Sequence, residues 1–211
     1  MRLLTAFFSL ALASSGAAQT VVPVGPFRSV ELRHGGHVVV RHGPAPRVTI
    51  LGDEVRCTRI EVDDRQRLVI DNGGRGCRHH GRLRLQIEVI TPGISALAVS
   101  NGGTLQSAGA FPAQDTIAAA VEQGGTVDIR SIPADAVAAA VDSGGRIFTH
   151  ARGTLSAAIR SGGAVMYWGD ARVTKSVRDG GVVRRGRPEQ AGSPLSELST
   201  VSPPVPVIPA H

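Results

Sequence analysis

The sequence contains few of the residues on which several protein classes depend. Only two cysteines occur in its 211 residues, and aromatic residues make up 3% of the chain. After the amino-terminal segment, no apolar run reaches the roughly 20 residues that a membrane-spanning helix requires. The mature chain is therefore not expected to span a membrane.

The distribution of charge argues against a nucleic-acid partner. The formal net charge is +6, and all but one of the 23 basic residues are arginine. Acidic residues are interleaved with them, so no continuous basic stripe forms. Nucleic-acid binding commonly combines such a stripe with aromatic side chains that stack on bases. After residue 18 the aromatic residues are Phe27, Phe111, Phe148, Tyr167 and Trp168, too few and too scattered for such a surface.

The first 18 residues are typical of a secretory signal peptide. Arg2 supplies a positive start, residues 3–13 are mostly apolar, and the small residues Gly16 and Ala18 precede Gln19. This layout predicts cleavage after Ala18 and export to the periplasm or the cell surface.

The composition divides the rest of the chain into a domain and a tail. Residues 187–211 contain six prolines and no aliphatic periodicity, which predicts a disordered tail. Residues 19–186 are predicted to form one domain, with irregular strands at 27–95 and regular repeats at 96–186. Since an oxidising compartment favours pairing of two thiols, we predict a disulfide between Cys57 and Cys77. Unpaired thiols, or thiolates that bind a metal, are the alternatives.

A glycine-pair motif recurs five times in the second half of the chain. Each copy has an aliphatic residue, two polar residues, two glycines, one further residue and a second aliphatic residue. The pairs are Gly102 and Gly103, Gly124 and Gly125, Gly144 and Gly145, Gly162 and Gly163, and Gly180 and Gly181. They follow one another at intervals of 22, 20, 18 and 18 residues. Such a repeat indicates a stacked array in which the pairs are structural turns, because glycine adopts a positive φ without strain.

The residues around these turns favour strands. Alternation in 126–130, with Val127 and Ile129, is typical of a strand that buries one face. The alanine-rich runs at 116–122, 134–142 and 154–160 favour helix by propensity, but each is only about two turns long. We therefore predict an all-β fold, a β-solenoid with coils of about 18–22 residues that turn at the glycine pairs. Helical repeats are the alternative.

Several short motifs precede the repeats in a fixed order. They are Phe27, Val30 and Leu32; then Val48, Ile50, Gly52 and Asp53; then Asp64, Leu68 and Ile70; then Leu85, Ile87, Val89, Thr91, Pro92, Ile94 and Leu97. Together with the glycine turns to Gly181, this order resembles the head GIN domain family of proposed auto-transporter adhesins. The resemblance implies a right-handed parallel β-helix similar in shape to pectin lyases but without their catalytic residues. It also implies a surface or adhesion role.

Histidines provide the weak candidates for a metal site. His34 and His37 flank a glycine pair, and His79 and His80 lie beside Cys77, so their imidazoles could bind Zn²⁺ or Cu²⁺. No spacing of carboxylates or thiolates matches a known site, and exposed loop histidines are the simpler interpretation. The sequence predicts no cofactor.

The carboxylates do not cluster as a hydrolase requires. Glycosidases use two carboxylates that flank the bond to be cut, whereas the aspartates here occupy different phases of the repeat. A left-handed β-helix acyltransferase, with His150 as its base, is a remote alternative.

We therefore predict a non-enzymatic, exported envelope or surface protein with an adhesin-like or scaffolding role. Its ligand could be a glycan, a lipid headgroup or a protein, and monomer and homo-oligomer both remain open. The alternative is a periplasmic carbohydrate-active or metal-binding protein.

Overall fold

The computed structural model describes residues 19–51, 57–73 and 85–188, and every regular element in these ranges is a β-strand. The first seven strands are β1 (Gln19–Val22), β2 (Ser29–Arg33), β3 (His37–His42), β4 (Arg47–Leu51), β5 (Arg59–Val62), β6 (Arg67–Asp71) and β7 (Gln86–Thr91). The repeats form β8 (Ala96–Ser100), β9 (Thr104–Ala108), β10 (Gln114–Glu122), β11 (Thr126–Ser143), β12 (Arg146–Ser161), β13 (Ala164–Trp168), β14 (Arg172–Val177) and β15 (Val182–Arg185). The alanine-rich runs lie in β10, β11 and β12, so the helical alternative is wrong.

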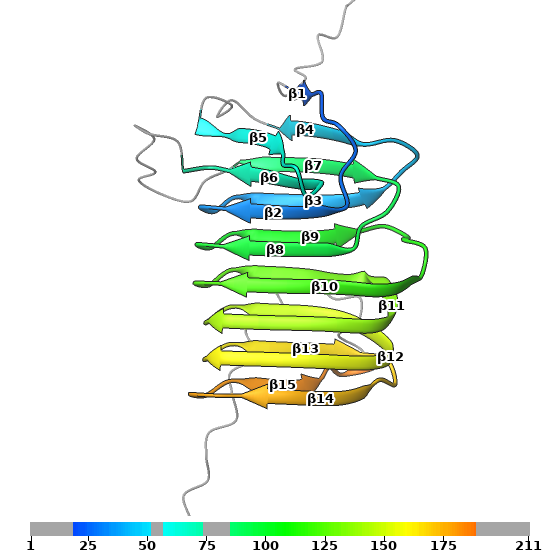
Figure 1. The fold of residues 1–211 in the computed structure, drawn as a ribbon, viewed down its shortest axis with the longest axis vertical. Coiled ribbons are helices and arrows are strands. Elements are labelled where there is room, and N and C mark those ends of the chain that lie inside the picture. Colours follow the sequence, from blue (N-terminus) through cyan, green and yellow to red (C-terminus); the bar gives the residue numbers. More distant parts are fainter. Residues whose placement is uncertain (1–18, 52–56, 74–84, 189–211) are drawn as a thin grey trace, which may run out of the picture.

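The strands form one sheet that folds back on itself into two layers (Figure 1). The front layer contains β5, β6, β2, β8, β10, the second halves of β11 and β12, and β14. The back layer contains β1, β4, β7, β3, β9, the first halves of β11 and β12, β13 and β15. Because β11 and β12 belong to both layers, the strand order runs down one layer and returns along the other.

The prediction of a right-handed parallel β-helix is wrong. β4 is antiparallel to both β1 and β7, and β5 is antiparallel to β6, while the remaining pairs are parallel. The sheet is therefore mixed, and it forms a nearly closed, flattened barrel rather than a β-solenoid. One cause is the short turn at 63–66, where the Gln66 amide donates to the Asp63 carbonyl at 2.9 Å. A turn this short can join only antiparallel strands.

In the second half of the chain, the repeat spacing sets the register of the parallel pairs. Val99 pairs with Val121, Val121 with Val141, and Val141 with Ile159, so residues at the same repeat position lie side by side. Strand alternation sends these side chains inward, where they are almost fully buried. The alanines Ala119, Ala139 and Ala157 also stack in the interior, where their small side chains suit a narrow space between the layers.

Candidate binding surface

The structure contains a sixth copy of the glycine turn, which the sequence analysis missed. His34, Gly35 and Gly36 have φ values of 60°, 86° and 103°, close to the 59°, 84° and 98° of Asn101, Gly102 and Gly103. The Thr104 amide donates to the Gly36 carbonyl at 2.9 Å, so the two turns stack. The signal was present in the sequence: Leu32 and Val38 flank this pair as aliphatic residues flank the others.

The two glycines of each turn have different environments. A Cβ on the first glycine, such as Gly124, would meet no atom within 4 Å, so its positive φ is its special feature. A Cβ on the second glycine, Gly125, would lie 2.6 Å from Val99 Cγ1 and 3.0 Å from the Gly103 carbonyl oxygen. The residue before the pair also varies in conformation: Asn101, Gln123 and Asp179 have positive φ, whereas the serines at 143 and 161 do not. The turns thus form one edge of the barrel, and the surfaces beside that edge are the candidates for binding.

The outer face of the front layer carries small side chains. Alternation along β10, β11, β12 and β14 sends the valines and isoleucine inward and leaves small residues on the outside. Strand pairing aligns these small residues in two rows across the four strands. We call them the small-residue platform: Ala120, Ala140, Ala158 and Ser176 in one row, and Ala118, Ala138, Ser156 and Thr174 in the other.

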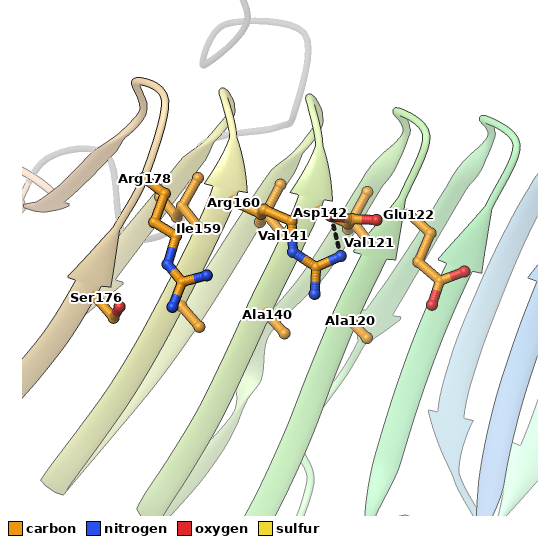
Figure 2. Close-up of a pocket in the computed structure, with 11 residues that line it drawn as sticks. Ala120, Val121, Glu122, Ala140, Val141, Asp142, Ile159, Arg160, Ser176 and Arg178 are labelled. Atoms are coloured by element: carbon orange, nitrogen blue, oxygen red, sulfur yellow. Dashed lines mark ion pairs between the residues drawn. The ribbon is translucent and has the colours of Figure 1, made fainter.

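Two shallow grooves lie on this face. The larger has a volume of about 380 Å³ and crosses β10, β11, β12 and β14 close to the glycine turns (Figure 2). The smaller has a volume of about 240 Å³ and lies farther from the turns on the same strands. Together they give the platform a long, open and nearly flat shape rather than an enclosed pocket.

A row of charges borders the larger groove on the side of the turns. Glu122, Asp142 and Arg160 lie on β10, β11 and β12, and Arg178 directly follows β14, so two acidic residues precede two basic ones (Figure 2). We call these four residues the charged row. In its centre, Asp142 and Arg160 form an ion pair at 3.0 Å. Within the described part of the chain, the outer members Glu122 and Arg178 have no ion-pair partner.

The histidines proposed as metal ligands have other contacts where the structure describes them. His34 Nδ1 lies 2.8 Å from Asp71 Oδ1, and the Gly73 amide donates to the same oxygen at 2.7 Å. Burial opposes ionisation of Asp71, but these hydrogen bonds outweigh it and hold the pKa of Asp71 below its ordinary value. His37 is half-buried on β3, and burial lowers the pKa of its imidazole.

His79 and His80 lie outside the described residues. Within the described ranges, no three His, Cys, Asp or Glu side chains are grouped as a metal site would require. Among the described candidates, only His34 lies within bonding distance of another possible metal ligand, the carboxylate of Asp71.

The aspartates of the repeats are distributed over the barrel, and four of them pair with arginines. Asp128 pairs with Arg130 on the back layer, and Asp142 with Arg160 on the front layer. At the edge opposite the glycine turns, Asp135 pairs with Arg152 and Asp170 with Arg185.

An aromatic cluster on the back layer was also not predicted from the sequence. Phe148, Met166 and Trp168 pack together on its outer side, and the Arg130 guanidinium lies 5.6 Å from the Phe148 ring centre and 5.3 Å from that of Trp168. Trp168 Nε1 donates to the Arg187 carbonyl at 2.9 Å. The 18-residue repeat was the available signal, since it places Phe148 beside Met166 and position 150 beside Trp168.

Three further predictions fall wholly or partly outside the described residues. The signal peptide occupies 1–18, and the predicted tail is described only at Arg187 and Pro188. No described cysteine is free, but Cys77 is not described, so its pairing with Cys57 stays a prediction.

Across 19–51, 57–73 and 85–188, the structure has no helix long and apolar enough to cross a membrane.

Comparison with known proteins confirms the family resemblance. Residues 26–118 match the family model described as "Putative auto-transporter adhesin, head GIN domain". The crystal structure of a "putative adhesin" from Bacteroides fragilis aligns with a TM-score of 0.53 and 15% identity, over 82% of this chain and 98% of that one. Another from Parabacteroides distasonis aligns with a TM-score of 0.47 and 12% identity, over 81% and 97%. Among curated proteins, none matches the sequence. The Bacteroides fragilis structure shares the fold of this chain.

Proposed function

We propose, because residues 26–118 match the head GIN domain family, that this chain is an exported, adhesin-like surface protein. In this proposal the partner binds to the small-residue platform and is oriented by the charged row. The observation that carries the proposal is a flat outer face, four strands wide, on which every platform side chain is alanine, serine or threonine. Export by the predicted signal peptide and a Cys57–Cys77 disulfide belong to the same proposal.

The chemistry of the platform favours binding over catalysis. Small side chains allow the surface of a partner to approach the sheet closely, which favours van der Waals contact over a large flat area. The platform's alanines offer no catalytic group, and no histidine or carboxylate within the described residues is hydrogen-bonded to the hydroxyls of Ser156, Thr174 and Ser176, as activation of a nucleophile would require. The charged row supplies direction, since complementary charges fix the register of a complex and suppress wrong partners.

Glycan hydrolysis is the second candidate, because Glu122 and Asp142 are neighbours on paired strands at the larger groove. Paired strands lie about 4.8 Å apart, a spacing near the roughly 5 Å between the carboxyls of retaining glycosidases. However, the Asp142 carboxylate already forms an ion pair with Arg160, which favours a structural role. If the second candidate is correct, Glu122→Gln abolishes hydrolysis of envelope glycans that the native protein cleaves.

The binding proposal can be tested with a labelled, purified protein and isolated cell envelopes. Ala140→Arg and Ala158→Arg each place a long charged side chain on the platform, where the present side chains are exposed. We expect each substitution to weaken envelope binding at least tenfold. Ala113→Arg is the matched control, because Ala113 is exposed but lies before β10, off the platform. Equal binding by all four proteins would contradict the use of this face.

A further inference from the structure

We propose that the partner of the platform is a second copy of this chain, bound face to face about a two-fold axis. The axis lies between β11 and β12 and runs parallel to them. This inference rests on the proposed function, since it uses the same face, and it names the partner of that face.

The inference rests on the order of the charges in the charged row. The four residues lie on or directly after consecutive strands in the order acidic, acidic, basic, basic: Glu122, Asp142, Arg160 and Arg178. A two-fold axis between the middle pair exchanges the first residue with the fourth and the second with the third. Glu122 of one copy then faces Arg178 of the other, at both ends of the row. The inner pair is already joined within one chain, so the interface gives partners to the two charges that have none within the described residues.

The platform is self-complementary under the same axis. Ala140 faces Ala158 of the second copy, and Ala120 faces Ser176, so the first row meets itself without a bulky side chain. In the second row, Ala138 faces Ser156. Both copies thus present the same patch, as an isologous interface requires.

The charges also select the direction of the axis. The alternative two-fold axis runs perpendicular to the strands, along the charged row. It would place each residue of the row opposite the same residue of the second copy. Glu122 would then face Glu122, and Arg178 would face Arg178. Like charges in direct apposition oppose association, so the arrangement parallel to the strands is favoured.

The size of the face sets the expected strength. Four strands at about 4.8 Å give a width of about 19 Å, and seven or eight residues at about 3.3 Å give a length of about 25 Å. Each copy then buries about 500 Å², or about 1,000 Å² in total, which is at the lower end of specific interfaces. We therefore expect a dimer that forms at micromolar concentrations and weakens as salt screens the charged row.

The test is a charge-swap series measured by sedimentation equilibrium from 1 to about 200 µM. We expect the native chain to dimerise, and the single variants Glu122→Arg and Arg178→Glu each to weaken self-association at least tenfold. An equimolar mixture of the two variants should recover the dimer, because each copy then offers the charges that the other requires. The double variant Glu122→Arg with Arg178→Glu should recover it alone. Within one chain these residues are three strand spacings apart, about 14 Å, so recovery cannot come from a contact inside one copy.

Controls distinguish a loss of dimerisation from a loss of folding. Each charge-swap variant alters an exposed position, and circular dichroism checks that its fold is unchanged. Glu61→Arg, on β5 at the far end of the front layer, should leave dimerisation unaltered. A native chain that is monomeric at 200 µM, or a mixture that gives no dimer, overturns the proposal. If Ala140→Arg and Ala158→Arg still abolish envelope binding in that case, the proposed function stands with a different partner.

Discussion

Gly125 lies directly on the preceding glycine turn, against Gly103. The carbonyl oxygen of Gly103 accepts a hydrogen bond from the Thr126 amide at 2.9 Å and would lie 3.0 Å from a Cβ on Gly125. The same contact recurs in the next turns, where Gly145 lies against the Gly125 carbonyl and Gly163 against that of Gly145. The second glycine is therefore required both for its positive φ and for the close approach of two turns.

This difference predicts unequal effects for alanine at the two positions. Gly124→Ala meets open space and should cost only the left-handed backbone penalty, about 1–2 kcal/mol of unfolding free energy. Gly125→Ala, at φ 106°, adds clashes with Val99 and with the backbone of the neighbouring turn, so we expect it to cost about 3 kcal/mol or more. Urea denaturation of the two variants compares them. Equal losses of stability would show that packing between turns is unimportant.

The ion pair between Asp128 and Arg130 predicts a second asymmetry. Its side chains are about nine-tenths buried and lie 2.6 Å apart, with Arg130 also over Phe148 and Trp168. Asp128→Ala leaves a buried guanidinium without that carboxylate, and we expect a loss of about 2–4 kcal/mol.

Replacement of both residues, as Asp128→Ala with Arg130→Met, should destabilise less than Asp128→Ala alone, because no buried charge is left over. Urea denaturation measures both variants. If the double variant is less stable than Asp128→Ala, Arg130 stabilises the back layer through its contacts with Phe148 and Trp168.

The repeat made much of the second half of the fold predictable. Its spacing gives the register of the parallel strands, which in turn places Phe148 beside Met166 and aligns Glu122, Asp142, Arg160 and Arg178. Aligned copies of the motif would therefore have revealed both the aromatic cluster and the charged row. The turn at Gly35 and Gly36 was also visible in principle, but its distance from the other five copies concealed it.

The first half could not be predicted in the same way. Alternation in β4 indicates a strand with a buried face, but alternation is the same in parallel and antiparallel strands. The antiparallel pairing of β4 with β1 and β7 depends on contacts between distant segments, such as Thr20 with Ile50 and Ile50 with Ile87. The same limit explains why a right-handed parallel β-helix was expected and a nearly closed barrel of mixed strands was found.

The predicted disulfide can be tested through stability and thiol chemistry. A bridge between Cys57 and Cys77 closes a loop of about 20 residues, for which the expected stabilisation is about 3 kcal/mol. Reductant should lower the urea midpoint of the native chain and leave that of Cys57→Ser with Cys77→Ser unchanged. Thiol titration of the native, denatured chain should find no reactive thiol before reduction. Two reactive thiols would rule out the bridge.

The lowered pKa of His37 predicts a dependence of stability on pH. Burial favours the neutral imidazole and lowers the pKa of His37 below the ordinary 6.5, and its paired neighbours Gln86 and Thr104 carry no charge that would oppose this. Between the lowered value and 6.5, the unfolded chain binds more protons than the folded one, so the unfolding free energy rises with pH. The neutral ring contributes its full stability above pH 6.5, and this contribution is lost as the pH falls through that window.

His37→Gln removes this titration while keeping a polar side chain of similar length. Thermal unfolding of both proteins at pH 7.5 and pH 5 should therefore show a larger loss of stability on acidification in the native chain than in the variant. The two proteins differ only at this position, so contributions from the rest of the chain cancel in the comparison. Equal losses would show that His37 is not desolvated in the folded chain, because a solvated imidazole on β3 would have the same pKa before and after unfolding.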